Sequence, residues 1–156
     1  MKIELWLVGR TEPYVNEAFE RFAKRIKHYI TFSVEVLPES RKKGNSSPEQ
    51  LKIAEAEAVL NRLADGDHLV LLDDKGKEMN SEGYAAWLNK LMVGGKRKVI
   101  FLVGGAYGFD STIYKRANDT LSLSKMTFSH QVVRVLFMEQ LYRGLTIINH
   151  QPYHHE

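Results

Sequence analysis

The chain has 156 residues, of which 44% are hydrophobic, 26% are charged and only 4 are proline. This composition is typical of a globular domain and excludes disordered, collagen-like and coiled-coil proteins. The absence of cysteine excludes disulfides, thiolate catalysis and cysteine-ligated metals, and it favours a cytoplasmic location. No apolar stretch approaches the ~18 residues that a membrane span needs, so we expect neither membrane insertion nor a secretion signal.

The net charge of +3, from 22 basic and 19 acidic residues, only weakly favours an anionic partner. The basic residues are concentrated between residues 21 and 43, where they outnumber acidic residues by seven to two. A solvated helix face would account for this excess. Alternatively, the loop residues Arg41, Lys42 and Lys43 contact the phosphates of a nucleic acid.

The first half of the chain predicts two strand–helix pairs. Residues 2–8 and 32–37 read as strands, and a helix begins between them near Pro13, with an apolar stripe of Val15, Phe19, Phe22, Ile26 and Tyr29. The segment 47–50 combines an N-cap serine, a proline at the first helical position and a capping-box glutamine. We expect it to begin a second helix that ends at residues 65–67 and has the stripe Ile53, Ala56, Leu60 and Leu63.

The second half continues the alternation. Strands are predicted at residues 68–72, 98–103 and about 120–123, with helices capped by Asn80 or Ser81 and by Asp110 or Ser111. A long last helix begins near His130, with the stripe Val133, Phe137, Leu141 and Leu145. This alternation predicts a single α/β domain over residues 1–156, with a parallel sheet covered by helices on both faces.

Ligands in such folds bind outside the carboxyl ends of the strands. The fourth strand is followed there by residues 104–108, whose three glycines would let the backbone approach a ligand closely. The glycines would equally serve a tight turn. The spacing is that of neither a dinucleotide-binding fingerprint nor a P-loop, so both are excluded.

Two further features suggest a site. Residues 123–130 mix apolar side chains with hydroxyls, which suits a ligand with a flat aromatic part such as adenosine, although core packing beside a helix cap would also explain them. Glu139 and Arg143 are four residues apart on the last helix and can form an ion pair. No two histidines have the spacing of a helical zinc site, so we expect no metal.

Four segments together resemble a known family. Residues 102–108, 121–130, 134–143 and 152–156 closely resemble those of the bacterial large-subunit rRNA pseudouridine N3-methyltransferases, which are S-adenosylmethionine-dependent enzymes of the SPOUT class. The resemblance extends over essentially the whole chain. It implies a C-terminal trefoil knot and an obligate homodimer with the cofactor pocket beside the subunit interface. Val132, Leu136 and Met138, which widen the apolar surface of the last helix, also favour a dimer.

The resemblance also implies roles for individual residues. The cofactor would be bound by Leu72, Gly104, Gly105, Leu123, Ser124, Lys125, Met126, Thr127 and Phe128. Because N3 of a pseudouridine carries a proton, a base must assist its removal, and His154 with Tyr153 beside it is the first candidate, followed by His130 and Glu139. The rRNA phosphates would be held by Arg41, Lys42, Lys43, Arg134 and Arg143.

Two other classes of function remain as alternatives. A nucleotide-binding regulatory module would share the fold and the glycine segment, whereas a non-enzymatic ribosome-binding factor would use the basic surface alone. The tail after the last helix is polar, so we expect residues 153–156 to add little to the core.

Overall fold

A computed structural model describes residues 1–40 and 44–155 of the chain. These residues form a five-stranded sheet in the order β2-β1-β4-β3-β5, in which all neighbouring strands are parallel. The predicted α/β class is therefore confirmed. The strands are β1 (Lys2–Val8), β2 (Thr31–Leu37), β3 (His68–Glu78), β4 (Lys98–Val103) and β5 (Asp119–Ser122).

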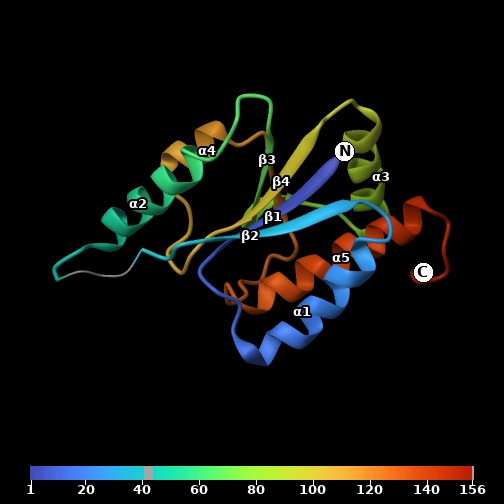
Figure 1. Ribbon diagram of the computed structural model, residues 1–156, viewed down its shortest axis with the longest axis horizontal. Coiled ribbons are helices and arrows are strands. Elements are labelled where there is room, and N and C mark those ends of the chain that lie inside the picture. Colours follow the sequence, from blue (N-terminus) through green and yellow to red (C-terminus); the bar gives the residue numbers. More distant parts are fainter. Residues whose placement is uncertain (41–43, 156) are drawn as a thin grey trace.

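Helices cover both faces of the sheet (Figure 1). On one face lie α1 (Pro13–Ile26), α3 (Ser81–Val93) and α5 (Val132–Ile148), and on the other lie α2 (Pro48–Leu60) and α4 (Ser111–Arg116). Each face has its own buried apolar cluster. The first includes Phe101 and Phe137, whose ring centroids lie 4.7 Å apart, and the second includes Trp6 and Ile100. A sheet buried on both faces needs strands with a continuous apolar run, as β4 has from Val99 to Val103.

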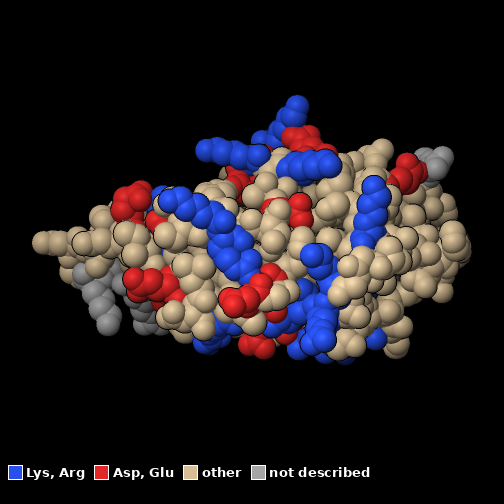
Figure 2. Space-filling view, turned by 90° about the horizontal axis from the view of Figure 1, so that it is seen from above, with Lys and Arg blue, Asp and Glu red and all other residues tan. Residues whose placement is uncertain are grey.

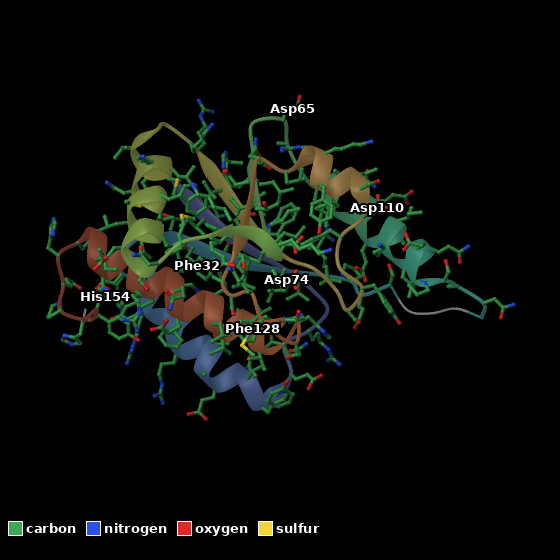
Figure 3. The ribbon with its side chains drawn as sticks, turned by 180° about the vertical axis from the view of Figure 1, so that it is seen from behind. Phe32, Asp65, Asp74, Asp110, Phe128 and His154 are labelled. Atoms are coloured by element: carbon green, nitrogen blue, oxygen red, sulfur yellow. The ribbon has the colours of Figure 1, made fainter. Side chains whose placement is uncertain are left out.

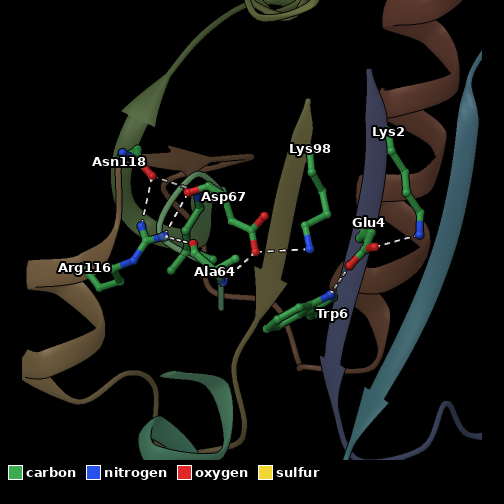
Figure 4. Close-up of polar contacts among 9 residues, drawn as sticks. Lys2, Glu4, Trp6, Ala64, Asp67, Lys98, Arg116 and Asn118 are labelled. Carbon is green, nitrogen blue, oxygen red and sulfur yellow. Dashed lines mark hydrogen bonds and ion pairs between the residues drawn. The ribbon is translucent and has the colours of Figure 1, made fainter. Parts of the chain in front are cut away.

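The acidic residue inside β1 is buried and paired. Glu4 accepts a hydrogen bond from the Trp6 indole nitrogen at 2.8 Å and forms an ion pair with Lys2 at 2.8 Å (Figure 4). These two partners offset the loss of hydration that a buried carboxylate would otherwise suffer. The strand therefore accommodates an acid in its apolar run.

The predicted helix starts are confirmed where capping residues were identified. Ser47 and Gln50 form the complete capping box of α2, Asn80 caps α3 and Asp110 caps α4. The predicted end of α2 is wrong, because the helix ends at Leu60, and its predicted stripe is confirmed except at Ile53. Ala56 is buried, and Leu60 and Leu63 pack against the second apolar cluster. Ile53 is 47% exposed, because the helix turns Leu51 and Val59 toward the protein interior instead.

Strand β3 extends beyond the predicted residues 68–72, to Glu78. Leu72 and Lys77 both pair with Leu121 of β5, so the four residues between them bulge out of the ladder. Gly76 lies where the strand rejoins the ladder with β5. Any other residue would clash there, because a Cβ would lie 2.8 Å from the Leu121 backbone. The bulge places Asp73 and Asp74 at the carboxyl edge of the sheet.

The last helix begins two residues after His130, close to the predicted start, and buries Phe137, Met138, Leu141 and Leu145 completely. Met138 was expected to widen an exposed apolar surface, and this expectation is wrong because α5 packs between α1 and α3, which cover that side chain. Val132 is 37% exposed. None of the helices in the described part of the chain is long and apolar enough to span a membrane.

Candidate functional site

A cavity of about 310 Å³ lies at the carboxyl ends of β3, β4 and β5, beside the start of α5. Its wall contains eight of the nine residues predicted to bind a cofactor, namely Leu72, Gly104, Gly105, Leu123, Ser124, Met126, Thr127 and Phe128. Lys125 is the exception, because its side chain is exposed to solvent and does not contribute to the wall. His130 also lines the cavity.

The glycine segment after β4 forms one wall of this cavity. A turn is closed by a hydrogen bond from the Gly108 N–H to the Gly105 carbonyl at 3.2 Å, and Gly108 has a φ of +81° that glycine adopts readily. At Gly104 a Cβ would lie 2.9 Å from Cε1 of Phe109, so no side chain fits without displacing that ring. Gly104 therefore keeps backbone exposed to the cavity.

The segment 123–130 forms the opposite wall and is held by its own hydroxyl groups. The Ser122 hydroxyl donates to the Ser124 carbonyl at 2.8 Å, and the Ser124 hydroxyl accepts from the Met126 N–H at 3.0 Å. Met126 and Phe128 are 75% and 38% exposed. These exposed apolar side chains give the cavity an apolar rim.

Sequence reasoning missed the polar group on the third side of the cavity, formed by Asp73, Asp74 and Tyr114. Asp73 accepts hydrogen bonds from the Tyr114 hydroxyl and from the Lys75 N–H, and Asp74 accepts one from the Thr127 hydroxyl at 2.9 Å. Burial and the bond to Asp73 raise the pKa of Tyr114 to about 12. The position of the two aspartates directly after a predicted strand was the signal that would have found them.

A carboxyl group lies behind the glycine segment. The Glu55 side chain of α2 approaches Gly105 so closely that a Cβ on that glycine would lie 2.8 Å from its Oε2. Burial of this carboxyl, reinforced by the negative charge of Glu39, raises the pKa of Glu55 to about 7. Near neutral pH, Glu55 therefore exchanges a proton directly behind the cavity wall.

We expect the Glu55→Gln variant to be more stable than wild type at pH 8, by ~1–2 kcal/mol after solvent screening of this partly buried site. The pKa of Glu55 is about 7 in the folded chain and 4.5 ordinarily, so the wild type loses stability as pH rises from about 4.5 through 7. The gain should vanish near pH 4.5. Urea unfolding at both pH values measures it, with the exposed Glu57→Gln as control. An equal gain at both pH values would contradict the prediction.

The tail brings together three of the four predicted catalytic residues, with Arg143. Arg143 pairs with Glu139 at 2.5 Å and lies 3.2 Å from Nδ1 of His154, while the Tyr153 hydroxyl donates to Glu139 at 3.1 Å. The Tyr153 ring packs on Tyr142, with centroids 4.6 Å apart. The expectation that the tail adds little to the core is therefore wrong for Tyr153. The predicted ion pair on α5 is confirmed.

The tail cluster lies away from the cavity, as the positions of His154 and Phe128 in Figure 3 show. Arg143, which contacts His154, lies roughly 15 Å along α5 from Val133 of the cavity wall at 1.5 Å per residue. Within one chain, His130 therefore lies beside the predicted cofactor residues, whereas Tyr153, His154 and Glu139 lie together in the tail cluster. The tail cluster does not reach the cavity of the same chain.

The residues predicted to contact rRNA lie in different environments. Arg134 is completely buried and donates hydrogen bonds to the carbonyls of Val8, Gly9 and His130, so its assignment to rRNA phosphates is wrong. Arg143 belongs to the tail cluster. Arg41, Lys42 and Lys43 lie outside the described residues. Figure 2 shows that lysine and arginine side chains are interspersed with acidic ones on the face it presents.

No group of three or more histidine, aspartate or glutamate side chains that could hold a metal ion occurs among residues 1–40 and 44–155.

Comparison with known proteins gives consistent matches. A family model described as a predicted SPOUT methyltransferase matches residues 1–154. Proteins named ribosomal RNA large subunit methyltransferase H from Parabacteroides distasonis, Porphyromonas gingivalis and Bacteroides fragilis are 47%, 46% and 45% identical to this chain. Each alignment covers 100% of both chains.

Proposed function

Because the chain belongs to the SPOUT methyltransferase family, we propose that it transfers the methyl group of S-adenosylmethionine to N3 of a pseudouridine in large-subunit ribosomal RNA. The supporting observation is the cavity at the carboxyl edge of the sheet, whose wall contains eight residues that the resemblance assigns to the cofactor. Relatives of the same length are named as large-subunit rRNA methyltransferases. The substrate places the enzyme in the cytoplasm with the ribosomes.

The residues present fit the cofactor. A cavity of about 310 Å³ falls in the range of small-molecule sites, and Gly104 presents backbone to it, since a Cβ there would clash with the Phe109 ring. Leu123 and Phe128 offer apolar surface for an adenine, while the backbone beside Gly104 and the Ser124 hydroxyl offer polar contacts. When bound, S-adenosylmethionine supplies an electrophilic methyl group on a positively charged sulfur. The chain holds donor and acceptor in line and excludes water.

Removal of the N3 proton falls to the tail cluster in this proposal. His154 can take up a proton through a ring nitrogen, and Arg143 beside Nδ1 orients the ring. The Tyr153 hydroxyl is anchored by Glu139. His130, which lines the cavity, remains the second candidate for the base.

Two copies of the chain would bring the tail cluster to the cavity. Roughly 15 Å along α5 separates Arg143, which contacts His154, from Val133 of the cavity wall within one chain. A tail held in this way acts at a cavity only if that cavity belongs to a second chain. The apolar rim of Met126, Phe128 and Val132 is available for such contact. We therefore propose a homodimer. The knot implied by the family resemblance stays a prediction.

The function is tested by the transfer of labelled methyl groups from S-adenosylmethionine to ribosomes or large subunits that lack the modification. We expect one methyl group per ribosome, at N3 of a pseudouridine. A regulatory module would bind the cofactor without transfer, and a ribosome-binding factor would bind subunits equally well without cofactor. Either result would contradict the proposal.

We expect Gly104→Val to lower the affinity for S-adenosylmethionine at least tenfold, since overpacking displaces the neighbouring ring into the cavity. The reason is the 2.9 Å between a Cβ at this position and the Phe109 ring, which lines the cavity. Calorimetric titration measures the loss. Gly66→Val is the matched control because nothing lies within 4 Å of a Cβ there. Unchanged affinity in a folded Gly104→Val protein would remove this segment from the site.

A further inference from the structure

The charged groups of the cavity wall have one sign. Among the described residues that line it, Asp73 and Asp74 are the only carboxylates and neither lysine nor arginine is present. The remaining wall is apolar or neutral, apart from the imidazole of His130 and the phenol of Tyr114. A cavity with such a wall attracts a ligand that carries positive charge.

Both carboxylates are fixed in position. Asp73 uses one oxygen to accept from the Lys75 N–H at 3.0 Å and the other to accept from the Tyr114 hydroxyl. Asp74 is tied by Thr127 to the opposite wall at 2.9 Å. Burial alone would raise the pKa of Asp73, but the hydrogen bonds from Tyr114 and Lys75 outweigh it and lower the pKa. Asp73 is therefore charged at neutral pH, and the positive charge of Lys75 also favours its charged form.

The two ligands of a methyl-transfer cycle differ in charge at one atom. The donor has a sulfonium, and when its carbon–sulfur bond breaks, the electron pair stays on sulfur and leaves a neutral thioether. The acceptor nitrogen gains the methyl group and loses its proton. Donor and product share the adenine, the ribose, the ammonium and the carboxylate, so only a charge near the sulfur can distinguish them electrostatically.

We propose that the Asp73 and Asp74 carboxylates recognise the positive sulfur of the donor and so make the site prefer S-adenosylmethionine to S-adenosylhomocysteine. This inference rests on the proposed function. Its consequence is that the interaction ends when the methyl group leaves, so a new molecule of the donor displaces the product from the site more readily. Because the attraction weakens along the reaction, the carboxylates act on donor binding more than on the chemical step.

The test is calorimetric titration of wild type, Asp73→Asn and Asp74→Asn with each of the two ligands. Asparagine is nearly isosteric with aspartate. Its one carbonyl oxygen can keep the hydrogen bond from Thr127 at position 74 and one of the two hydrogen bonds at position 73, where the amide nitrogen can donate to the Tyr114 hydroxyl oxygen instead. We expect wild type to prefer the donor by about tenfold or more, a ratio within reach of one unit charge at short range. In Asp73→Asn this ratio should fall to about one or two, with the product affinity nearly unchanged. Asp74→Asn, whose carboxylate is exposed, should show a smaller fall.

Asp65→Asn is the matched control. It removes the same charge from an exposed turn remote from the cavity (Figure 3), and it should leave the ratio unchanged. In steady state, Asp73→Asn should raise the KM for the donor relative to the inhibition constant of the product. It should cause no loss of kcat, because the attraction that is removed is made to the bound donor more than to the transition state.

Three outcomes would overturn the inference. If both ligands lose affinity equally in both variants, the carboxylates contact groups that the two ligands share. If the ratio in wild type is already one, the cavity does not distinguish the sulfur charge. Binding of neither ligand to the wild type would instead overturn the proposed function, and the inference with it.

Discussion

Replacing His154 by alanine is expected to lower the rate of methyl transfer to ribosomes by about 100-fold, within the range for loss of a general base. The imidazole is held 3.2 Å from Arg143 and 3.6 Å from Glu82, and its loss removes the group best placed to accept the N3 proton. Binding of the cofactor should be unchanged. The melting temperature should change by no more than a few degrees, because the side chain makes only these two polar contacts.

The neighbouring His155 supplies the matched control. It is exposed, and its side chain makes no hydrogen bond or ion pair with the described residues, so His155→Ala should retain most of the activity. Deleting the tail is a poorer test, because Tyr153 packs on Tyr142 and its removal would disturb α5. Full activity of His154→Ala would exclude the tail from catalysis and make His130 the next residue to test.

Mixing two impaired variants tests whether the tail acts in a second chain, provided that the donor concentration is too low to saturate Gly104→Val. In a heterodimer of Gly104→Val and His154→Ala, one site combines both defects and the other combines an intact cavity with an intact tail. If half of the dimers are mixed and each has one intact site, about a quarter of the wild-type activity should return. A site completed within one chain would give no recovery, because every site would then contain one defect.

The strand–helix alternation was readable from the sequence because its signals are local. Ser47, Asn80 and Asp110 cap helices through hydrogen bonds to residues two or three positions ahead, so short-range patterns suffice to place them. The bulge in β3 was not readable, because it depends on pairing with Leu121, more than forty residues away. The burial of Met138 likewise depends on two other helices rather than on α5 alone.

The candidate site shows the same division. The cofactor residues followed from the family resemblance together with the rule that ligands bind at the carboxyl ends of strands. Asp73 and Asp74 were overlooked because no motif marks an acidic pair in a bulge. Arg134 was assigned to RNA because its positive charge suits a phosphate, and the sequence alone does not show that the side chain is buried. The fold shows that its guanidinium donates hydrogen bonds to the Val8 and Gly9 carbonyls at the end of β1.

Arg134→Met is expected to destabilise the protein by about 3–5 kcal/mol, in the range for breaking a buried charged network. The guanidinium donates to the carbonyls of Val8, Gly9 and His130 at 2.9–3.0 Å and to the Thr11 hydroxyl at 3.0 Å. Methionine fills much of the volume but donates nothing, so these buried acceptors lose their partner. The melting temperature should fall by about 10 °C, measured by calorimetry at neutral pH.

We expect Arg134→Met to disturb the cavity wall as well, because Arg134 donates a hydrogen bond to the carbonyl of His130, which lines the cavity. Arg116→Met is the matched control, since Arg116 also donates to two carbonyls, those of Ala64 and Asp67, at a partly exposed site (Figure 4). The Arg116→Met protein should lose only about 1 kcal/mol of stability, because water can replace the lost donor. If the two variants lost equal stability, or if Arg134→Met lost less than Arg116→Met, the buried guanidinium would not be what holds α5 to β1. If rRNA affinity fell in a fully stable Arg134→Met protein, the original assignment of this residue to phosphate binding would have to be restored.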